Sequence, residues 1–177
     1  MKSKSSARAA RPEDADATAG DAPFLLESFL PYRLSVTTNR ISRLFARRYS
    51  EAYGLSIPEW RVLAVIGRAG TLSPGRVAQW AAMDKVKVSR AAAALVARGL
   101  LRQSADPADG RGRQLSLTRK GQTVHRGVIP LARAMEAQLA TALTRTEWTA
   151  LGTALNKLNA HVLAIEGPDA ETDGAVD

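Results

Sequence analysis

The sequence contains no cysteine and only two histidines, His125 and His161, among its 177 residues. The absence of cysteine excludes disulfide bonds, thiolate metal sites, cysteine nucleophiles and sensing by thiol oxidation. Two isolated histidines leave little for a metal site or a catalytic dyad. No G-x-S-x-G, Walker, Rossmann or metal-ligand pattern occurs either. We therefore expect a protein that is not an enzyme and that holds no metal and no resident cofactor.

Long apolar runs are also missing from the chain. The longest one, residues 91–97, is closed by Arg90 and Arg98 and is far shorter than a membrane-spanning helix. No apolar segment follows the charged N-terminal residues, as a secretory signal would require. We expect a soluble, cytoplasmic protein without a membrane partner.

Aromatic residues make up only 5% of the chain, but apolar residues reach 45%, which favours a mainly helical domain with a hydrophobic core. The net charge of +8 is unevenly distributed. Residues 55–121 hold twelve basic and four acidic side chains, whereas residues 167–177 hold four acidic and no basic ones. A basic stretch of this kind is what a polyanion-binding module requires. A generally basic, solvated surface is the alternative interpretation.

The periodicity of apolar residues divides the chain into tails, helices and one hairpin. Residues 1–23 and 167–177 lack periodicity and are predicted to be disordered. A long first helix is predicted from residue 25 to Gly54, bent near Pro31, and a helix kinked at Pro130 is predicted over residues 119–141. Further helices are predicted at residues 57–69, 74–81, 85–98 and 145–166, with strands at 100–104 and 114–118 and start signals at Ser56, Ser73, Asp84, Thr118 and Thr144.

The helix over residues 85–98 has one apolar and one polar face. A helical wheel centred on Val88 places Ala91, Ala92 and Leu95 on the inner side. The outer side carries cationic, hydroxyl and small apolar groups, which suit the edges of bases in a major groove and DNA phosphates. A solvated face of an amphipathic helix is the alternative. The DNA-binding residues predicted on this helix and at the start of the preceding one are Ser73, Lys85, Val86, Lys87, Ser89 and Arg90.

The predicted hairpin has a charged tip rich in turn residues. Two glycines and one proline between residues 106 and 113 favour tight turns that carry Arg111 and Arg113. An arginine-bearing loop beside a recognition helix can enter an adjacent minor groove. A simple solvent-exposed turn is the alternative. The order of helix, short helix, helix and charged hairpin predicts a winged helix-turn-helix, mainly α with a small β-hairpin wing.

At these residues the sequence resembles the MarR family of bacterial transcription regulators. The matching segments are Asp106-Pro107-Ala108-Asp109-Gly110-Arg111, Leu115-Ser116-Leu117-Thr118 with Gly121, Asp84 through Arg90, and Gly99-Leu100. The chain departs from the family at Ala108 and Gly110, where further arginines are frequent. The resemblance implies a homodimer in which residues 24–54 and 119–166 dimerise and residues 55–118 form a winged lobe that binds a pseudo-palindrome in double-stranded DNA.

The resemblance also implies an effector bound between the dimerisation helices and the winged lobe. Small aromatic carboxylates, or aromatic-acid CoA thioesters, are the ligand classes expected. The candidate residues are Tyr32, Arg33, Trp60, His125 and Arg126, which offer aromatic walls and cations. Burial in the core for Trp60, and a solvated helix surface for His125 and Arg126, are the alternatives. The expected function is a ligand-released repressor, and the alternative is an architectural DNA-binding protein without an effector.

Overall fold

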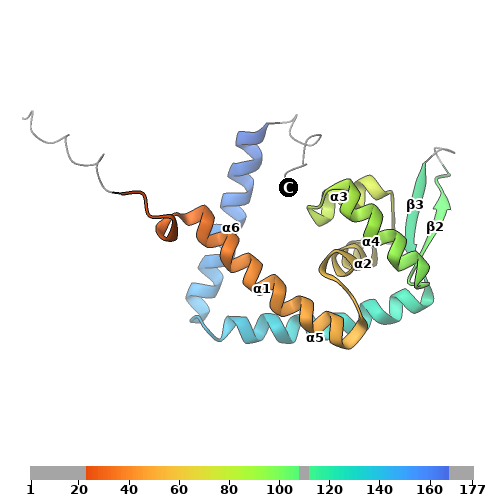
Figure 1. Ribbon diagram of the computed structural model, residues 1–177, viewed down its shortest axis with the longest axis horizontal. Coiled ribbons are helices and arrows are strands. Elements are labelled where there is room, and N and C mark those ends of the chain that lie inside the picture. The colour runs from red at the N-terminus through yellow and green to blue at the C-terminus, as the bar shows by residue number, and fades with distance from the viewer. Residues whose placement is uncertain (1–22, 108–111, 168–177) are drawn as a thin grey trace, which may run out of the picture. The chain divides into compact units, whose positions relative to one another are not determined.

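The computed structural model describes residues 23–107 and 112–167, and Figure 1 shows its elements. The chain divides into two units, residues 1–39 and 40–177. The described part of the first unit contains a short 3₁₀ turn, η1 (Leu26–Ser28), and the beginning of α1 (Leu30–Tyr53), which continues into the second unit. The first helix was predicted to begin at residue 25, but in the structure it begins at Leu30. Pro31 explains the difference, since a proline without an N–H is accommodated best in the first turn of a helix.

The second unit contains the remaining helices. These are α2 (Ile57–Ala69), α3 (Pro74–Ala81), α4 (Lys85–Ala97), α5 (Arg119–Ala140) and α6 (Arg145–Glu166). Side chains cap their N-termini at the predicted positions. Ser56 and Thr144 each form a capping box with the glutamate three residues later, and Asp84 accepts a hydrogen bond from the Lys87 N–H. The helix starts follow from these local contacts, each of which satisfies backbone N–H groups that the helix itself leaves unpaired.

Three antiparallel strands form the sheet of the wing. They are β1 (Thr71–Leu72), β2 (Leu101–Ala105) and β3 (Arg113–Leu117), in the order β1-β3-β2. The two predicted strands are present with each boundary shifted by one residue, and β1 was not predicted. The register pairs Thr71 with Ser116, Leu101 with Leu117, and Ala105 with Arg113.

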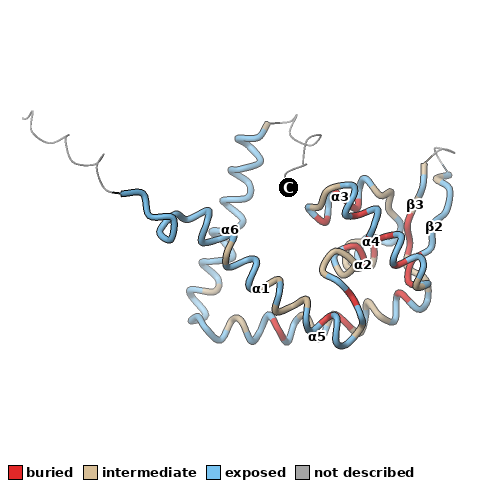
Figure 2. Tube along the Cα trace, in the orientation of Figure 1, coloured by how far each residue is buried: buried red, intermediate tan, exposed pale blue. Residues whose placement is uncertain are grey.

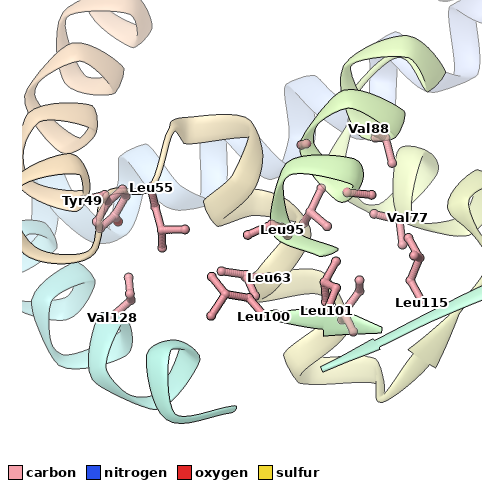
Figure 3. Packing of buried hydrophobic residues seen from close by; sticks show 14 of the residues in the cluster. Tyr49, Leu55, Leu63, Val77, Val88, Leu95, Leu100, Leu101, Leu115 and Val128 are labelled. Carbon is pink, nitrogen blue, oxygen red and sulfur yellow. The ribbon is translucent and has the colours of Figure 1, made fainter. Parts of the chain in front are cut away.

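A single core joins α2, α3, α4, α5, the C-terminal part of α1 and the sheet. Figure 3 shows side chains from α1, α2, α3, α4, α5 and the strands meeting in it. The labelled residues include Tyr49, Leu63, Val88, Leu115 and Val128, each no more than 1% exposed. Val88, Ala91, Ala92 and Leu95 are the buried residues of α4, as the helical wheel predicted. The outer side of α4 is thereby fixed towards solvent.

Buried residues are distributed unevenly along the chain (Figure 2). α6 spans 22 residues and has none, although it carries a regular row of three leucines and one valine. Within the described residues, no helix combines the length and the apolar character needed to cross a membrane.

Candidate nucleic-acid interface and pocket

The N-terminal half of α4 presents the side chains predicted to bind DNA. Lys85, Val86, Lys87, Ser89 and Arg90 are all exposed. Val86 keeps 59% of its surface in solvent, so its methyl groups are accessible to a partner. The predicted set therefore lies on one accessible surface, which we call the α4 face.

Asp84, at the start of the α4 face, caps α4 and forms its contacts with Lys87 of the same helix. Its carboxylate accepts a hydrogen bond from the Lys87 N–H (2.6 Å) and pairs with Lys87 Nζ (3.1 Å). The backbone hydrogen bond from Lys87 lowers the pKa of Asp84 below its usual value, with smaller contributions from the Lys87 side chain. Lys85 and Arg90 form no ion pair with any described residue. Their charges remain available to an anionic partner.

The remaining predicted contacts lie at the start of α3 and on the wing. Ser73 caps α3, where its Oγ accepts a hydrogen bond from the Arg76 N–H (3.4 Å). Arg113 opens β3 and is exposed. Arg111 falls outside the described residues, so its predicted role stays a prediction. The Asp106 N–H donates to the Gly112 carbonyl (2.9 Å), which joins the two described ends of the wing.

Arg98 makes contacts that sequence reasoning missed. Its guanidinium donates to the carbonyls of Tyr53 and Gly54 (2.8 Å each) and lies 3.5 Å from the carboxylate of Glu59. Lys120 Nζ donates to the Arg98 carbonyl (3.0 Å). The C-terminal end of α4 is thus tied to the junction of α1 and α2. No local pattern signals these contacts, because the acceptors are backbone carbonyls 44 and 45 positions away.

The sequence also did not predict a cluster of two arginines around Trp80. The guanidinium carbons of Arg68, at the end of α2, and Arg76, on α3, lie 5.5 Å and 5.9 Å from the centre of the Trp80 ring. Trp80 is 44% exposed, and both arginines are exposed. We call these three residues the Arg-Trp-Arg cluster. The spacing of Arg76 and Trp80, one helical turn apart on α3, was the available signal.

A cavity of about 630 Å³ lies among α1, α2, α5 and the start of α6, within the second unit. Four rings run along it: Phe45 and Tyr49 are 5.8 Å apart between centroids, Tyr49 and Trp60 are 5.3 Å apart, and Trp60 stacks on His125 at 6.3 Å. Burial lowers the pKa of His125, which favours the neutral imidazole. The charged side chains of the lining are Arg61, Arg133 and Glu136.

Two of the five residues predicted to bind an effector line this cavity. Trp60 and His125 do so, and Trp60 is partly buried and packs against the edge of the core. Arg126 is exposed and does not line it, since it lies about 100° around the helix from His125. Tyr32 and Arg33 belong to the other unit and are exposed. The arginines that do line the cavity are Arg61 and Arg133.

Comparisons with known proteins agree with this architecture. The model of the MarR family matches residues 53–112, which span α2, β1, α3, α4 and β2. This segment, about a third of the chain, is similar to the MarR family. A comparison with curated protein sequences finds no match.

Solved structures extend the MarR family similarity beyond the matched segment. A probable transcriptional regulator from Pseudomonas aeruginosa is 28% identical, with a TM-score of 0.70 over 76% of this chain and 99% of that one. A MarR family regulator from Silicibacter pomeroyi is 29% identical, with a TM-score of 0.65 over 78% and 92%. Bordetella bronchiseptica BpsR, described in terms of regulation of its DNA binding by 6-hydroxynicotinic acid, is 24% identical, with a TM-score of 0.62 over 72% and 98%. These coverages include helices on both sides of the winged lobe.

Proposed function

We propose that the chain is a transcriptional repressor that binds a pseudo-palindromic operator as a homodimer and is released by a small aromatic carboxylate. The α4 face is the main observation in support of DNA binding. It combines two cations that pair with no described carboxylate (Lys85 and Arg90), a hydroxyl (Ser89) and an exposed methyl-bearing side chain (Val86) on one helix of a winged lobe. These groups match the phosphates, base edges and thymine methyl groups of a major groove.

The homodimer is supported by α6. Its apolar row remains 42–48% exposed at Leu151, Leu155, Leu158 and Val162, and the helix buries no residue within its own chain. A surface of this kind on a soluble domain marks a site of association. In a two-fold dimer the same row would meet its own copy and would set two recognition helices at a fixed spacing.

The effector class is supported by the chemistry of the cavity. Its volume of about 630 Å³ lies within the range of about 300–1,000 Å³ that is usual for small-molecule sites. Aromatic rings on one side and Arg61 and Arg133 on the lining suit a flat ligand with a carboxylate. The description of BpsR names an aromatic acid as the regulator of that protein. Aromatic-acid CoA thioesters, whose acyl part has the same chemistry, form the second class of ligand to test.

Thermal-shift measurements against aromatic acids and their CoA thioesters, followed by gel shift with the protein's own promoter, test this proposal. We expect one acid to raise the melting temperature and to release the promoter fragment. Arg133→Met should abolish that shift, whereas Arg145→Met, which changes an exposed arginine outside the cavity, should not. Binding that is equally strong on promoter and unrelated DNA, and unaffected by any ligand, would favour the architectural alternative.

A further inference from the structure

We propose that the Arg-Trp-Arg cluster (Arg68, Trp80 and Arg76) is an additional contact of the lobe with the DNA backbone. Trp80 acts as a positioning residue that holds both guanidiniums ready for phosphate oxygens. This inference rests on the proposed DNA-binding function. It adds a contact on α2 and α3 to the α4 face and the wing.

The exposure of Trp80 is the first argument. α3 supplies the core with Val77, Ala78 and Ala81, whereas Trp80 lies outside it and keeps 44% of its surface in solvent. Its described ring contacts are the two guanidiniums. Neither Arg68 nor Arg76 forms an ion pair within residues 23–107 and 112–167. The cluster thus holds two positive charges that no carboxylate in those ranges neutralises.

The cation–π contacts leave both cations able to bind. Each guanidinium carbon lies within about 6 Å of the ring centre, and the N–H groups that do not face the ring can still donate to a phosphate. A side chain held by the ring already has less of the rotational freedom that a free arginine gives up on binding. The contact with Trp80 is therefore compatible with phosphate binding and reduces its entropic cost.

The position of the cluster favours DNA over an acidic protein as the partner. Arg76 is the third residue of α3, beside the Ser73 cap, where the positive end of the helix dipole also attracts anions. The α3–α4 joint is short and internally bonded, since the Met83 N–H donates to the Ala78 carbonyl (3.0 Å). In a helix-turn-helix the helix before the recognition helix crosses the DNA backbone. A duplex bound to the α4 face would therefore extend towards α3.

The salt dependence of binding to a duplex of mixed sequence tests the contact, because phosphate contacts require no operator. Fluorescence anisotropy would compare the unmodified protein with Arg68→Ala, Arg76→Ala and the control Arg145→Ala, an exposed arginine at the start of α6. The slope of log affinity against log salt should fall by about 0.9 for each phosphate that a cluster variant no longer neutralises. The control should keep the slope of the unmodified protein.

Trp80 variants separate positioning from charge. Trp80→Leu keeps the net charge and should weaken duplex binding about three- to tenfold, whereas Trp80→Phe, which retains an aromatic face, should bind nearly as well as the unmodified protein. Melting temperatures measured alongside would show that each variant is folded.

Two outcomes overturn the inference. Slopes and affinities that stay unchanged in the cluster variants, while the unmodified protein binds DNA, overturn it alone and point to an acidic protein as the partner of the cluster. An unmodified protein that binds no duplex overturns the proposed function together with it.

Discussion

At the scale of single residues, Gly121 lets α5 pack closely against the backbone just before β2. It is buried in the first turn of α5, and a Cβ there would collide with the carbonyl oxygen of Leu100. The same junction is fixed by Thr118, whose Oγ1 donates to the Gly99 carbonyl (2.7 Å) and accepts from the Gly121 N–H (3.0 Å). The path from α4 through the wing into α5 therefore depends on the absence of a side chain at residue 121.

Gly121→Ala should destabilise the fold by about 2–3 kcal/mol, because backbone atoms must move to admit the methyl group. Gly152→Ala is the matched control. Gly152 is also helical but has no neighbour within 4 Å, so the change should stabilise α6 by up to about 1 kcal/mol. Urea unfolding followed by circular dichroism measures both. Equal effects of the two substitutions would contradict the close contact at Leu100.

His125 should make the stability of the protein depend on pH. Burial lowers the pKa of His125 in the folded state below its value in the unfolded chain, about 6.5. The unfolded state then binds the proton more readily, so the contribution of His125 is fully present above about pH 6.5 and is lost as the pH falls through the lower, folded-state pKa. His125→Gln should flatten the decline of unfolding free energy in this acidic window. The exposed His161→Gln is the control, and an equally flattened curve for it would contradict this assignment.

At the scale of secondary-structure elements, local signals explain what the sequence could predict. Helix starts were predictable because each cap lies within three residues of its partner, as with Ser56 and Glu59 or Thr144 and Glu147. The buried side of α4 was predictable from helical period alone. β1 escaped prediction because a strand of two residues has no period, and its partner Ser116 lies far along the chain. The role of Arg61 and Arg133 in lining the cavity could not be predicted for a related reason. Tertiary packing decides which residues of α2 and α5 face the cavity.

α4 should lose DNA affinity when its central cation is removed. Arg90→Ala should weaken operator binding by about 1–3 kcal/mol, and it should relax base preference if Arg90 contacts a base or act uniformly if it contacts a phosphate. Anisotropy titrations at matched salt with cognate and altered duplexes distinguish the two cases. Lys157→Ala, on the exposed surface of α6, is the control. Affinity equal to that of the unmodified protein would show that the α4 face is not the recognition surface.

The tie between α4 and the α1–α2 junction should contribute measurably to stability. Arg98→Met keeps much of the apolar stem but removes two hydrogen bonds from a charged donor to the carbonyls of Tyr53 and Gly54. The guanidinium is partly exposed, so we expect a decrease of about 2–3 kcal/mol in unfolding free energy. Arg47→Met, at an exposed site on α1, should change it little. A decrease no larger than that of the control would mean that water replaces both hydrogen bonds.

At the scale of the whole molecule, α6 is a helix whose apolar row is exposed, and we propose that this row forms the dimer interface. A carboxylate in this row should disrupt association, because an unpaired charge is costly to bury in an interface. Leu155→Asp should therefore yield a monomer or an unfolded chain, whereas Asn156→Asp, its exposed neighbour with the same added charge, should remain dimeric. Removal of residues 1–23 should leave the dimer intact. Light scattering measures all three proteins, and a stable monomer for the unmodified chain would contradict the homodimer.

In the proposed homodimer, an α6 that buries no residue within its own chain would make the lifetime of the protein depend on how much of it a cell contains. When folding and pairing are linked, the apparent stability falls with dilution, by about 1.4 kcal/mol for each tenfold decrease in free partner. Newly made copies that have not yet met a partner would expose these leucines to proteases. Protein at low concentration would thus be degraded faster than protein at high concentration. The response of its promoter to expression level would then be steeper than operator affinity alone would set.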